Sequence, residues 1–408
     1  MTALWMRIRY MNLKKDKTNM MINQTKYHWL MALPALLLAV GCSESILPEG
    51  QDTGVAELQV SPQVVLTRGA IDAGSDVSAV GNALGSIAVY ANSKTTNKTT
   101  NNYGLYTYSS SAWGNSATDK IYLSAEEATI YAHYPAYQPG SNGEFQSSGT
   151  ALKATNSSGE YTESSTINIS VFPGKSGDAN AKIDFQSIDN SDGQTSTKDK
   201  ILAASGEVDY MYADQGSTGV KASYKNGDTN KIGKVTLAMK HALAMVSFRV
   251  YADHTYKNTG TFSKLVLANK SGNTTLNNGA SPAMKIKDGT ITPGSSPAAV
   301  TYTRDIANYM LSKATADTDQ ARATAKNSAR KASILVLPES TVDKSTVEAT
   351  LTIDNQDYKV ALPGSGSAWE AGKNYLYTVK LSGSELVISS VTVTQWTTVA
   401  SSTDLDIK

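Results

Sequence analysis

The chain has 408 residues, which is enough for two domains of ordinary size. Its 37 lysines and arginines nearly balance 36 aspartates and glutamates, so the charge gives no reason to expect nucleic acid or an anionic membrane surface as a partner. A single cysteine excludes an intrachain disulfide, and 21 tyrosines beside 5 phenylalanines, with only 18% charged residues, are typical of an exported β-protein with polar loops.

The first recognisable element is a secretory signal. A lysine precedes the apolar stretch Trp29–Val40, which is too short to span a bilayer, and small residues lead from it into Cys42. This pattern predicts a signal peptide over residues 1–41, a lipid anchor such as palmitate on Cys42, and a polar tether after it. The alternative is a short buried helix beside a chance cysteine. Because the residues before the signal exceed what it needs, we expect translation to begin at Met20 or Met21.

The segment Glu57–Arg68 alternates between apolar and polar residues, with Val65 as the exception. Its apolar positions are Leu58, Val60, Pro62, Val64 and Leu66. This alternation predicts a β-strand with one buried face, and the central proline favours an edge strand or a β-bulge.

A basic residue ends this strand. Arg68 is the only arginine between Cys42 and Phe248, and Gly69 follows it, so a trypsin-like, arginine-specific protease would find one arginine site there. We interpret residues 42–68 as a lipidated tether with a removable strand, whose loss opens a groove for another subunit. The alternative is an ordinary first strand followed by a loop.

Short strand candidates separated by turn-rich loops continue to the end of the chain, and they predict an all-β protein built of β-sandwiches. The polar stretch 221–231 is the candidate domain boundary, which gives sandwiches over residues 69–225 and 226–408. The Ala/Lys/Arg-rich stretch 305–332 is predicted to be a surface insertion, in part helical. The strand candidates are residues 86–91, 103–108, 121–123, 128–134, 167–172, 182–185, 208–213, 234–250 with a break near His241, 262–268, 333–337, 346–353, 358–362, 374–381 and 385–396.

The sequence offers no catalytic, metal-binding or cofactor-binding constellation. His133 and His241 have neither H-x-x-x-H nor paired-cysteine spacing around them, and we interpret each as a satisfied strand residue. The stretch 174–176 lacks the first glycine of a phosphate loop, and no G-x-S-x-G elbow occurs. Trp113 and Trp369 could stack on a sugar, although core or rim positions are the commoner outcome. We therefore expect no enzyme, no metal and no cofactor.

Several segments, taken in order, resemble one family. Besides the lipoprotein cysteine and the strand that ends at Arg68, they are Ala128–Pro135 (ATIYAHYP), Val208–Ala213 (VDYMYA), His241–Val246 (HALAMV), Trp369–Tyr377 (WEAGKNYLY) and Val391–Trp396 (VTVTQW). Together they resemble the fimbrillins, the major-subunit family of Bacteroides-type (type V) pili, over essentially the whole chain. The insertion at residues 305–332 matches no part of that pattern.

This resemblance implies two tandem transthyretin-like Greek-key β-sandwich domains. It also implies export as a lipoprotein to the outer membrane and cleavage after Arg68. Head-to-tail polymerisation with other pilin subunits by strand exchange would follow. The product would be a surface fimbrium for cell adhesion, with a host or bacterial surface ligand as a further partner.

The C-terminal tail is the candidate donor strand for that exchange. From Val391 onward one parity carries apolar residues at both ends, Leu405 and Ile407 at the second, with Val399 between the ends, and two aspartates take the other parity. Such a strand can place one face in a groove and leave its charges outside. The alternative is that Leu405 and Ile407 complete the parent sandwich.

Two other functions fit parts of the sequence. A surface glycan-binding lipoprotein would also consist of β-sandwiches behind a lipidated cysteine, but it would need exposed aromatic residues and no proteolysis. N-terminal sequencing of a mature protein that starts at Gly69 would exclude it. An exported hydrolase would need an acid–base or nucleophile constellation, which the sequence lacks.

Overall fold

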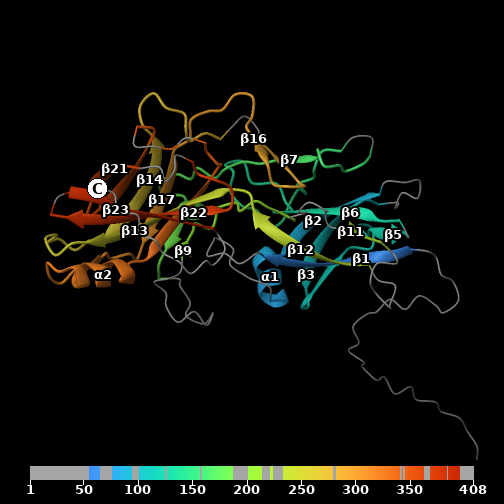
Figure 1. Cartoon of the computed structure of the whole chain (residues 1–408), viewed down its shortest axis with the longest axis horizontal. Helices are drawn as coiled ribbons and strands as arrows, with labels where there is room; N and C mark the ends of the chain where they lie inside the picture. The colour runs from blue at the N-terminus through green and yellow to red at the C-terminus, as the bar shows by residue number, and fades with distance from the viewer. Residues whose placement is uncertain are drawn as a thin grey trace, which may run out of the picture. The chain divides into compact units, whose positions relative to one another are not determined.

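The computed structural model is built mainly of β-strands (Figure 1). Its described part contains strands β1 to β23, helices α1 and α2, and one short 3-10 helix over Ala179–Ala181. Within this part no helix is both long and apolar enough to cross a membrane. The described residues are 55–64, 76–93, 101–124, 126–156, 159–186, 201–213, 221–223, 233–278, 282–340, 342, 345–362, 368–383 and 385–395.

A nine-stranded sheet contains most of the early strands. Its order is β4-β3-β2-β6-β10-β12-β1-β5, with β11 paired to β6. The pair β1 and β12 is parallel, and the other described strand pairs in this sheet are antiparallel. The strands are β1 (Val55–Val64), β2 (Ser86–Ser93), β3 (Tyr103–Ser109), β4 (Ala112–Asn115), β5 (Tyr122–Ser124), β6 (Ala128–Tyr134), β10 (Met211–Ala213), β11 (Lys221–Ala222) and β12 (Gly233–His241).

Three further sheets contain the later strands. A six-stranded sheet has the order β23-β22-β13-β19-β9 with β18 on β13, a five-stranded sheet has β21-β20-β14-β17-β8, and a three-stranded sheet has β16-β15-β7. The strands are β7 (Thr166–Asn168), β8 (Lys182–Asp184), β9 (Ile201–Leu202), β13 (Ala244–Ala252), β14 (Phe262–Asn269), β15 (Ala283–Lys285), β16 (Ile291–Thr292), β17 (Tyr302–Ala307), β18 (Ser312–Lys313), β19 (Lys331–Val336), β20 (Val347–Ile353), β21 (Gln356–Ala361), β22 (Lys373–Ser382) and β23 (Glu385–Gln395).

The prediction of an all-β protein is confirmed in part, because strands predominate among the described residues but two α-helices are present there. The break near His241 is confirmed, because β12 ends there and β13 begins at Ala244. Strands β7, β8 and β9 join sheets formed by later strands, whereas β12 joins the nine-stranded sheet. The sheets thus share strands across residue 225. The division into domains at that residue and the transthyretin-like Greek-key arrangement stay predictions.

Two short helices lie beside the sheets. Helix α1 (Val77–Leu84), which was not predicted, begins where the Asp76 carboxylate accepts a hydrogen bond from the Ala79 N–H at 2.7 Å. It ends at Gly85, whose φ of 64° is accessible to glycine without strain. Helix α2 (Asp319–Ser328) confirms that the predicted insertion at 305–332 is in part helical, although the ends of that range lie in β17 and β19.

Packing divides the interior into two main cores. One core lies on the nine-stranded sheet and includes β1 and α1, and the other joins the later sheets to residues of β2 and β6. A buried ion pair reinforces the second core, because Arg304 of β17 donates from Nη2 to Oε1 of Glu207 at 2.6 Å. Glu207 Oε2 also accepts the Leu335 N–H at 3.3 Å, so the segment before β10 is tied to β17 and β19.

Candidate functional site

Strand β1 lies between β12 and β5, with unequal support on its two sides (Figure 1). On one side residues 58–64 pair with residues 233–239 of β12. On the other side only Val55, Ala56 and Glu57 pair with β5, and the Leu58 N–H donates to the Ile121 carbonyl at 2.8 Å. Among the described residues, β12 is therefore the only strand partner for the second half of β1.

The predicted alternation of β1 is present in the structure. Leu58 and Val64 are 1% and 2% exposed, whereas Gln59 on the other face is exposed. The apolar face packs in a core with Val80 of α1 and Leu237 of β12. Strand β1 therefore forms part of a core wall rather than lying on the surface.

Pro62 occupies the half of β1 whose only described strand partner is β12, where it stands in register with Leu237. A residue without an N–H is tolerated at such an edge. The register with β12 runs from Leu58 to Val64 without a shift. The predicted edge position is thus confirmed for this half of the strand, and the alternative of a bulge is wrong.

Two polar contacts hold the first half of β1. The Tyr106 hydroxyl of β3 donates to the Leu58 carbonyl at 2.8 Å, and burial raises the pKa of that hydroxyl. Lys120 Nζ donates to Glu57 Oε2 at 2.7 Å, and this hydrogen bond raises the pKa of the lysine. Both contacts bind β1 to side chains that lie well after Arg68 in the chain.

Strand β23 is an edge strand that pairs along its length with β22. A register shift near Thr378 interrupts the ladder. Val391 and Val393, which share one face in the predicted alternation, differ in the structure, with 3% and 37% exposure. The start of the predicted donor pattern therefore belongs to the parent sheet.

The residues predicted to be lipidated, cleaved or inserted into a neighbouring subunit all lie outside the described residues. They are Cys42, Arg68, Gly69, Val399, Leu405 and Ile407. The nearest described positions are Val64, where β1 ends, and Gln395, where β23 ends. The strands that flank these sites can be described, but the sites themselves stay predictions.

Both histidines in question are buried strand residues, as predicted. His133 Nε2 lies 2.9 Å from the Tyr90 hydroxyl and Nδ1 lies 3.1 Å from the Pro135 carbonyl. Burial lowers the pKa of His133 to about 4, so its ring is neutral at physiological pH. His241 Nδ1 lies 2.8 Å from Asp209 Oδ1, and both side chains are 2% exposed.

The two tryptophans do not form a common sugar platform. Trp369 is fully buried, and its Nε1 donates to the Tyr377 hydroxyl at 3.1 Å. Trp113 is half-buried and packs against Tyr108, with ring centroids 5.6 Å apart. Trp369 is thus a core residue and Trp113 a rim residue, which is the commoner alternative to a sugar-binding role.

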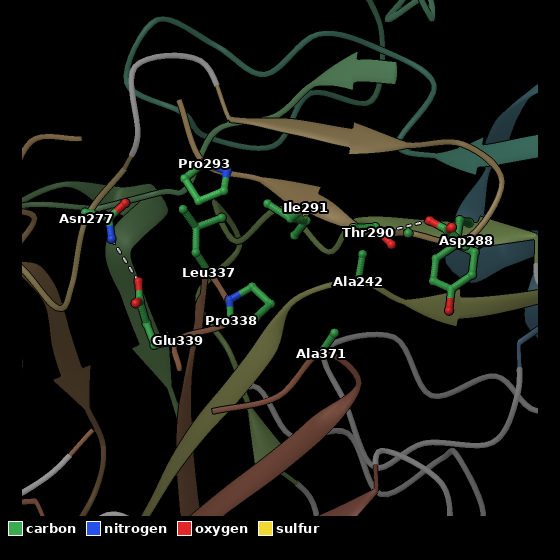
Figure 2. Close-up of a pocket in the computed structure, with 12 residues that line it drawn as sticks. Ala242, Asn277, Asp288, Thr290, Ile291, Pro293, Leu337, Pro338, Glu339 and Ala371 are labelled. Atoms are coloured by element: carbon green, nitrogen blue, oxygen red, sulfur yellow. Dashed lines mark hydrogen bonds between the residues drawn. The ribbon is translucent and has the colours of Figure 1, made fainter. Parts of the chain in front are cut away.

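The structure adds a pocket that the sequence did not reveal (Figure 2). Its volume is about 260 Å³. At one end Asn277 Nδ2 donates to Glu339 Oε1 at 2.9 Å, and burial raises the pKa of the Glu339 carboxyl to about 8. Further along the lining, Asp288 Oδ1 accepts the Thr290 N–H at 2.9 Å. No local motif could have indicated the pocket, since Asn277 and Glu339 are 62 positions apart.

Comparison with known proteins identifies the family. The fimbrillin-like family model matches residues 79–396. The chain belongs to the fimbrillin-like family. The sequence resemblance is thereby confirmed, and the match includes most strands of the nine-stranded sheet and the later sheets, but not β1.

Several solved structures resemble this fimbrillin-like chain. A proposed cell adhesion protein from Bacteroides uniformis has 18% identity and a TM-score of 0.44, with 84% of this chain and 100% of that chain covered. A proposed cell adhesion protein from Bacteroides ovatus has 15% identity and a TM-score of 0.47, with 84% and 98% covered. A fimbrial protein from Bacteroides vulgatus has 14% identity and a TM-score of 0.46, with 84% and 99% covered. No curated protein matches the chain.

Proposed function

We propose that the chain is a structural subunit of a surface fimbrium that acts in cell adhesion. It is exported as a lipoprotein anchored through Cys42 in the outer membrane. A trypsin-like, arginine-specific protease then cuts between Arg68 and Gly69, and subunits polymerise by donor-strand exchange. Membership of the fimbrillin-like family supports the fimbrial role, and the fimbrial and adhesion names of similar structures agree with it.

The observation that carries this proposal is the position of β1. It is a core strand, yet it lies in the part of the chain that cleavage after Arg68 would remove. Its release would leave residues 233–238 of β12 without their described strand partner. It would also uncover the apolar groove that Leu58 and Val64 fill. Unpaired backbone groups beside an apolar groove are a template for another strand.

The energetics favour a tightly bound replacement strand. Each backbone hydrogen bond that it makes would contribute about 0.5–1.5 kcal/mol. Each apolar side chain that it buries would contribute about 1.5–3 kcal/mol. The sum exceeds ~10 kcal/mol before the ordering costs are subtracted, which is enough for slow dissociation.

The donor in this proposal is the tail after Trp396, with Val399, Leu405 and Ile407 facing the groove. A donor and a groove at different places on one subunit make a heterologous contact that does not close, so the product is a filament.

We further propose that the subunit consists of two tandem transthyretin-like Greek-key sandwiches, over residues 69–225 and 226–408. The β-rich architecture is compatible with β-sandwich domains.

The test is assembly of purified subunits with an arginine-specific protease. The native chain should be cut after Arg68, start at Gly69 by mass spectrometry, and form ladders of polymers. Arg68→Ala should remain monomeric and melt at a higher temperature than the cut native chain, because it keeps β1. Gln59→Ala, on the exposed face of β1, is the matched control and should assemble normally.

A truncated chain that ends at Trp396 tests the donor separately. After cleavage it should accept a donor but provide none, so it should shorten the polymers of the native chain. Ladders from Arg68→Ala would contradict the role of cleavage. Normal polymerisation of the truncated chain alone would show that the donor lies elsewhere.

A further inference from the structure

The pocket beside Glu339 is formed by segments from distant parts of the chain (Figure 2). The turn between β15 and β16 contributes Asp288 and Thr290, and the segment after β19 contributes Pro338 and Glu339. Ala371 lines it from the loop that precedes β22. Because these segments are held by two different sheets and their connections, the fold itself positions the lining.

Apolar walls make up much of this pocket. Pro293, Leu337 and Pro338 present ring and methyl surfaces to it. Tyr212 also lines it and packs against Gly289 so closely that any Cβ at position 289 would overlap the tyrosine ring. Flat C–H surfaces and an aromatic ring of this kind are complementary to the apolar face of a sugar ring.

The polar groups lie in two sets along the lining. Asn277 and Glu339 form the first set, joined by their 2.9 Å hydrogen bond. Since burial raises the pKa of Glu339 to about 8, its carboxyl is largely protonated at neutral pH and can both donate and accept. Asp288 and Thr290 form the second set, with a carboxylate and a hydroxyl.

The lining also limits what the pocket can bind. The described residues that line it include no lysine, arginine or histidine, so an anionic ligand would find no cationic partner there. Its volume of about 260 Å³ is slightly below the ~300–1,000 Å³ typical of sites for drug-sized ligands, which points to a single small ring.

We propose that this pocket binds one neutral hexopyranose ring, such as the terminal unit of a glycan. The ring lies with its C–H face on Pro293 and Pro338, and its hydroxyls bind to the amide and carboxyl of Asn277 and Glu339. This proposal is independent of cleavage and strand exchange, since it uses none of the residues in β1 or the tail.

Saturation-transfer NMR on the full chain in a sugar-free detergent tests the proposal. The probes are the methyl α-glycosides of glucose, galactose and mannose, which carry the linkage of a terminal sugar. Sialic acid and glucosamine serve as charged comparators. At least one neutral glycoside should give signals that Asn277→Ala weakens, with affinity lower by about tenfold, the effect of one or two lost hydrogen bonds.

Two further variants separate binding from folding. Ala371→Phe fills the pocket from an exposed loop position without removing a polar group, and it should abolish the signal while the melting temperature stays near that of the native chain. Glu126→Gln changes an exposed carboxylate outside the lining and should leave binding unchanged. All three variants should still polymerise after cleavage, so a failure here does not touch the proposed fimbrial role.

The outcomes are decisive in either direction. The absence of a signal from all three neutral glycosides would overturn the proposal, as would a preference for sialic acid or glucosamine. An undiminished signal in Ala371→Phe would place any sugar binding elsewhere on the chain and would equally overturn it.

Discussion

Strands β1 and β23, the first and last described strands, lie at or next to the margins of their sheets but are built differently. Leu58 and Val64 of β1 are 1% and 2% exposed. On β23, Val387 and Val393 are 39% and 37% exposed. Strand β1 buries four apolar side chains, Ala56, Leu58, Val60 and Val64, whereas β23 buries two, Leu386 and Val391.

The difference decides what the loss of each strand would expose. Removal of β1 would leave a groove with an apolar floor, because its partners Leu237 and Val80 remain in place. Removal of β23 would expose a new edge on β22 and uncover the smaller apolar surface that Leu386 and Val391 cover. The first opening therefore combines backbone pairing with the larger side-chain burial for an incoming strand. This is why the groove of β1, rather than the edge of β23, is the receptor in our account.

The largest expected difference between β1 and β23 comes from truncating one apolar side chain on each strand. Leu58→Ala in the uncut chain should lower the free energy of unfolding by about 2–5 kcal/mol, since it leaves a cavity in the core. Val387→Ala on β23 should change it by less than about 0.5 kcal/mol. Chemical denaturation monitored by circular dichroism measures both. Equal losses would contradict the assignment of β1 as the core strand.

A smaller effect should follow from the hydroxyl that binds the backbone of β1. Tyr106→Phe removes the 2.8 Å hydrogen bond to the Leu58 carbonyl and should destabilise the uncut chain by about 0.5–1.5 kcal/mol. Tyr122→Phe, at a 39% exposed position on neighbouring β5, is the matched control and should have little effect. After release of β1 the two variants should melt alike. A persistent difference in the cut chain would mean that Tyr106 acts on something other than β1.

The smallest effect concerns the ion pair between Glu57 and Lys120, whose side chains are 27% and 30% exposed. Lys120→Met should lower the stability of the uncut chain by about 0.2–1 kcal/mol, and less in high salt. The hydrogen bond to Glu57 raises the pKa of Lys120 above its ordinary value of 10.5. The stabilisation by this ion pair is therefore fully present below pH 10.5. It is lost as pH rises through the raised pKa. Thermal melts of the native chain and of Lys120→Met at pH 7 and above pH 11 check this. A difference in melting temperature between the two that grows with pH would contradict it.

Local periodicity made β1 and most other strands predictable from the sequence. The alternation around Val60 needs only a period of two, and the burial pattern of the strand follows it. The break after His241 was likewise predictable, since β12 and β13 have apolar runs on either side of it. Helix α1 could have been found from Asp76 and Gly85, which cap an i, i+3, i+7 apolar pattern, although eight residues give a weak period.

What the sequence could not provide are contacts between distant segments. The parallel pairing of β1 with β12 joins residues more than a hundred positions apart, and nothing in either strand specifies the partner. The pocket depends on Asn277 meeting Glu339, and burial then changes the acid–base behaviour of the carboxyl. The exposure of Val393 differs from that of Val391 although both lie in one unshifted stretch of the ladder with β22, which simple alternation does not foresee.

Hydrogen exchange of β12 tests whether cleavage opens the groove of β1 and polymerisation fills it again, because residues 233–238 have β1 as their described strand partner. Mass spectrometry should find this segment protected in the uncut chain. It should exchange at least about tenfold faster in the cut monomer freed of residues 42–68, and be protected again in the polymer. Strand β20, which pairs with β14 and β21, is the internal control and should not change. Protection of β12 that persists in the cut monomer, or that fails to return in the polymer, would contradict the account.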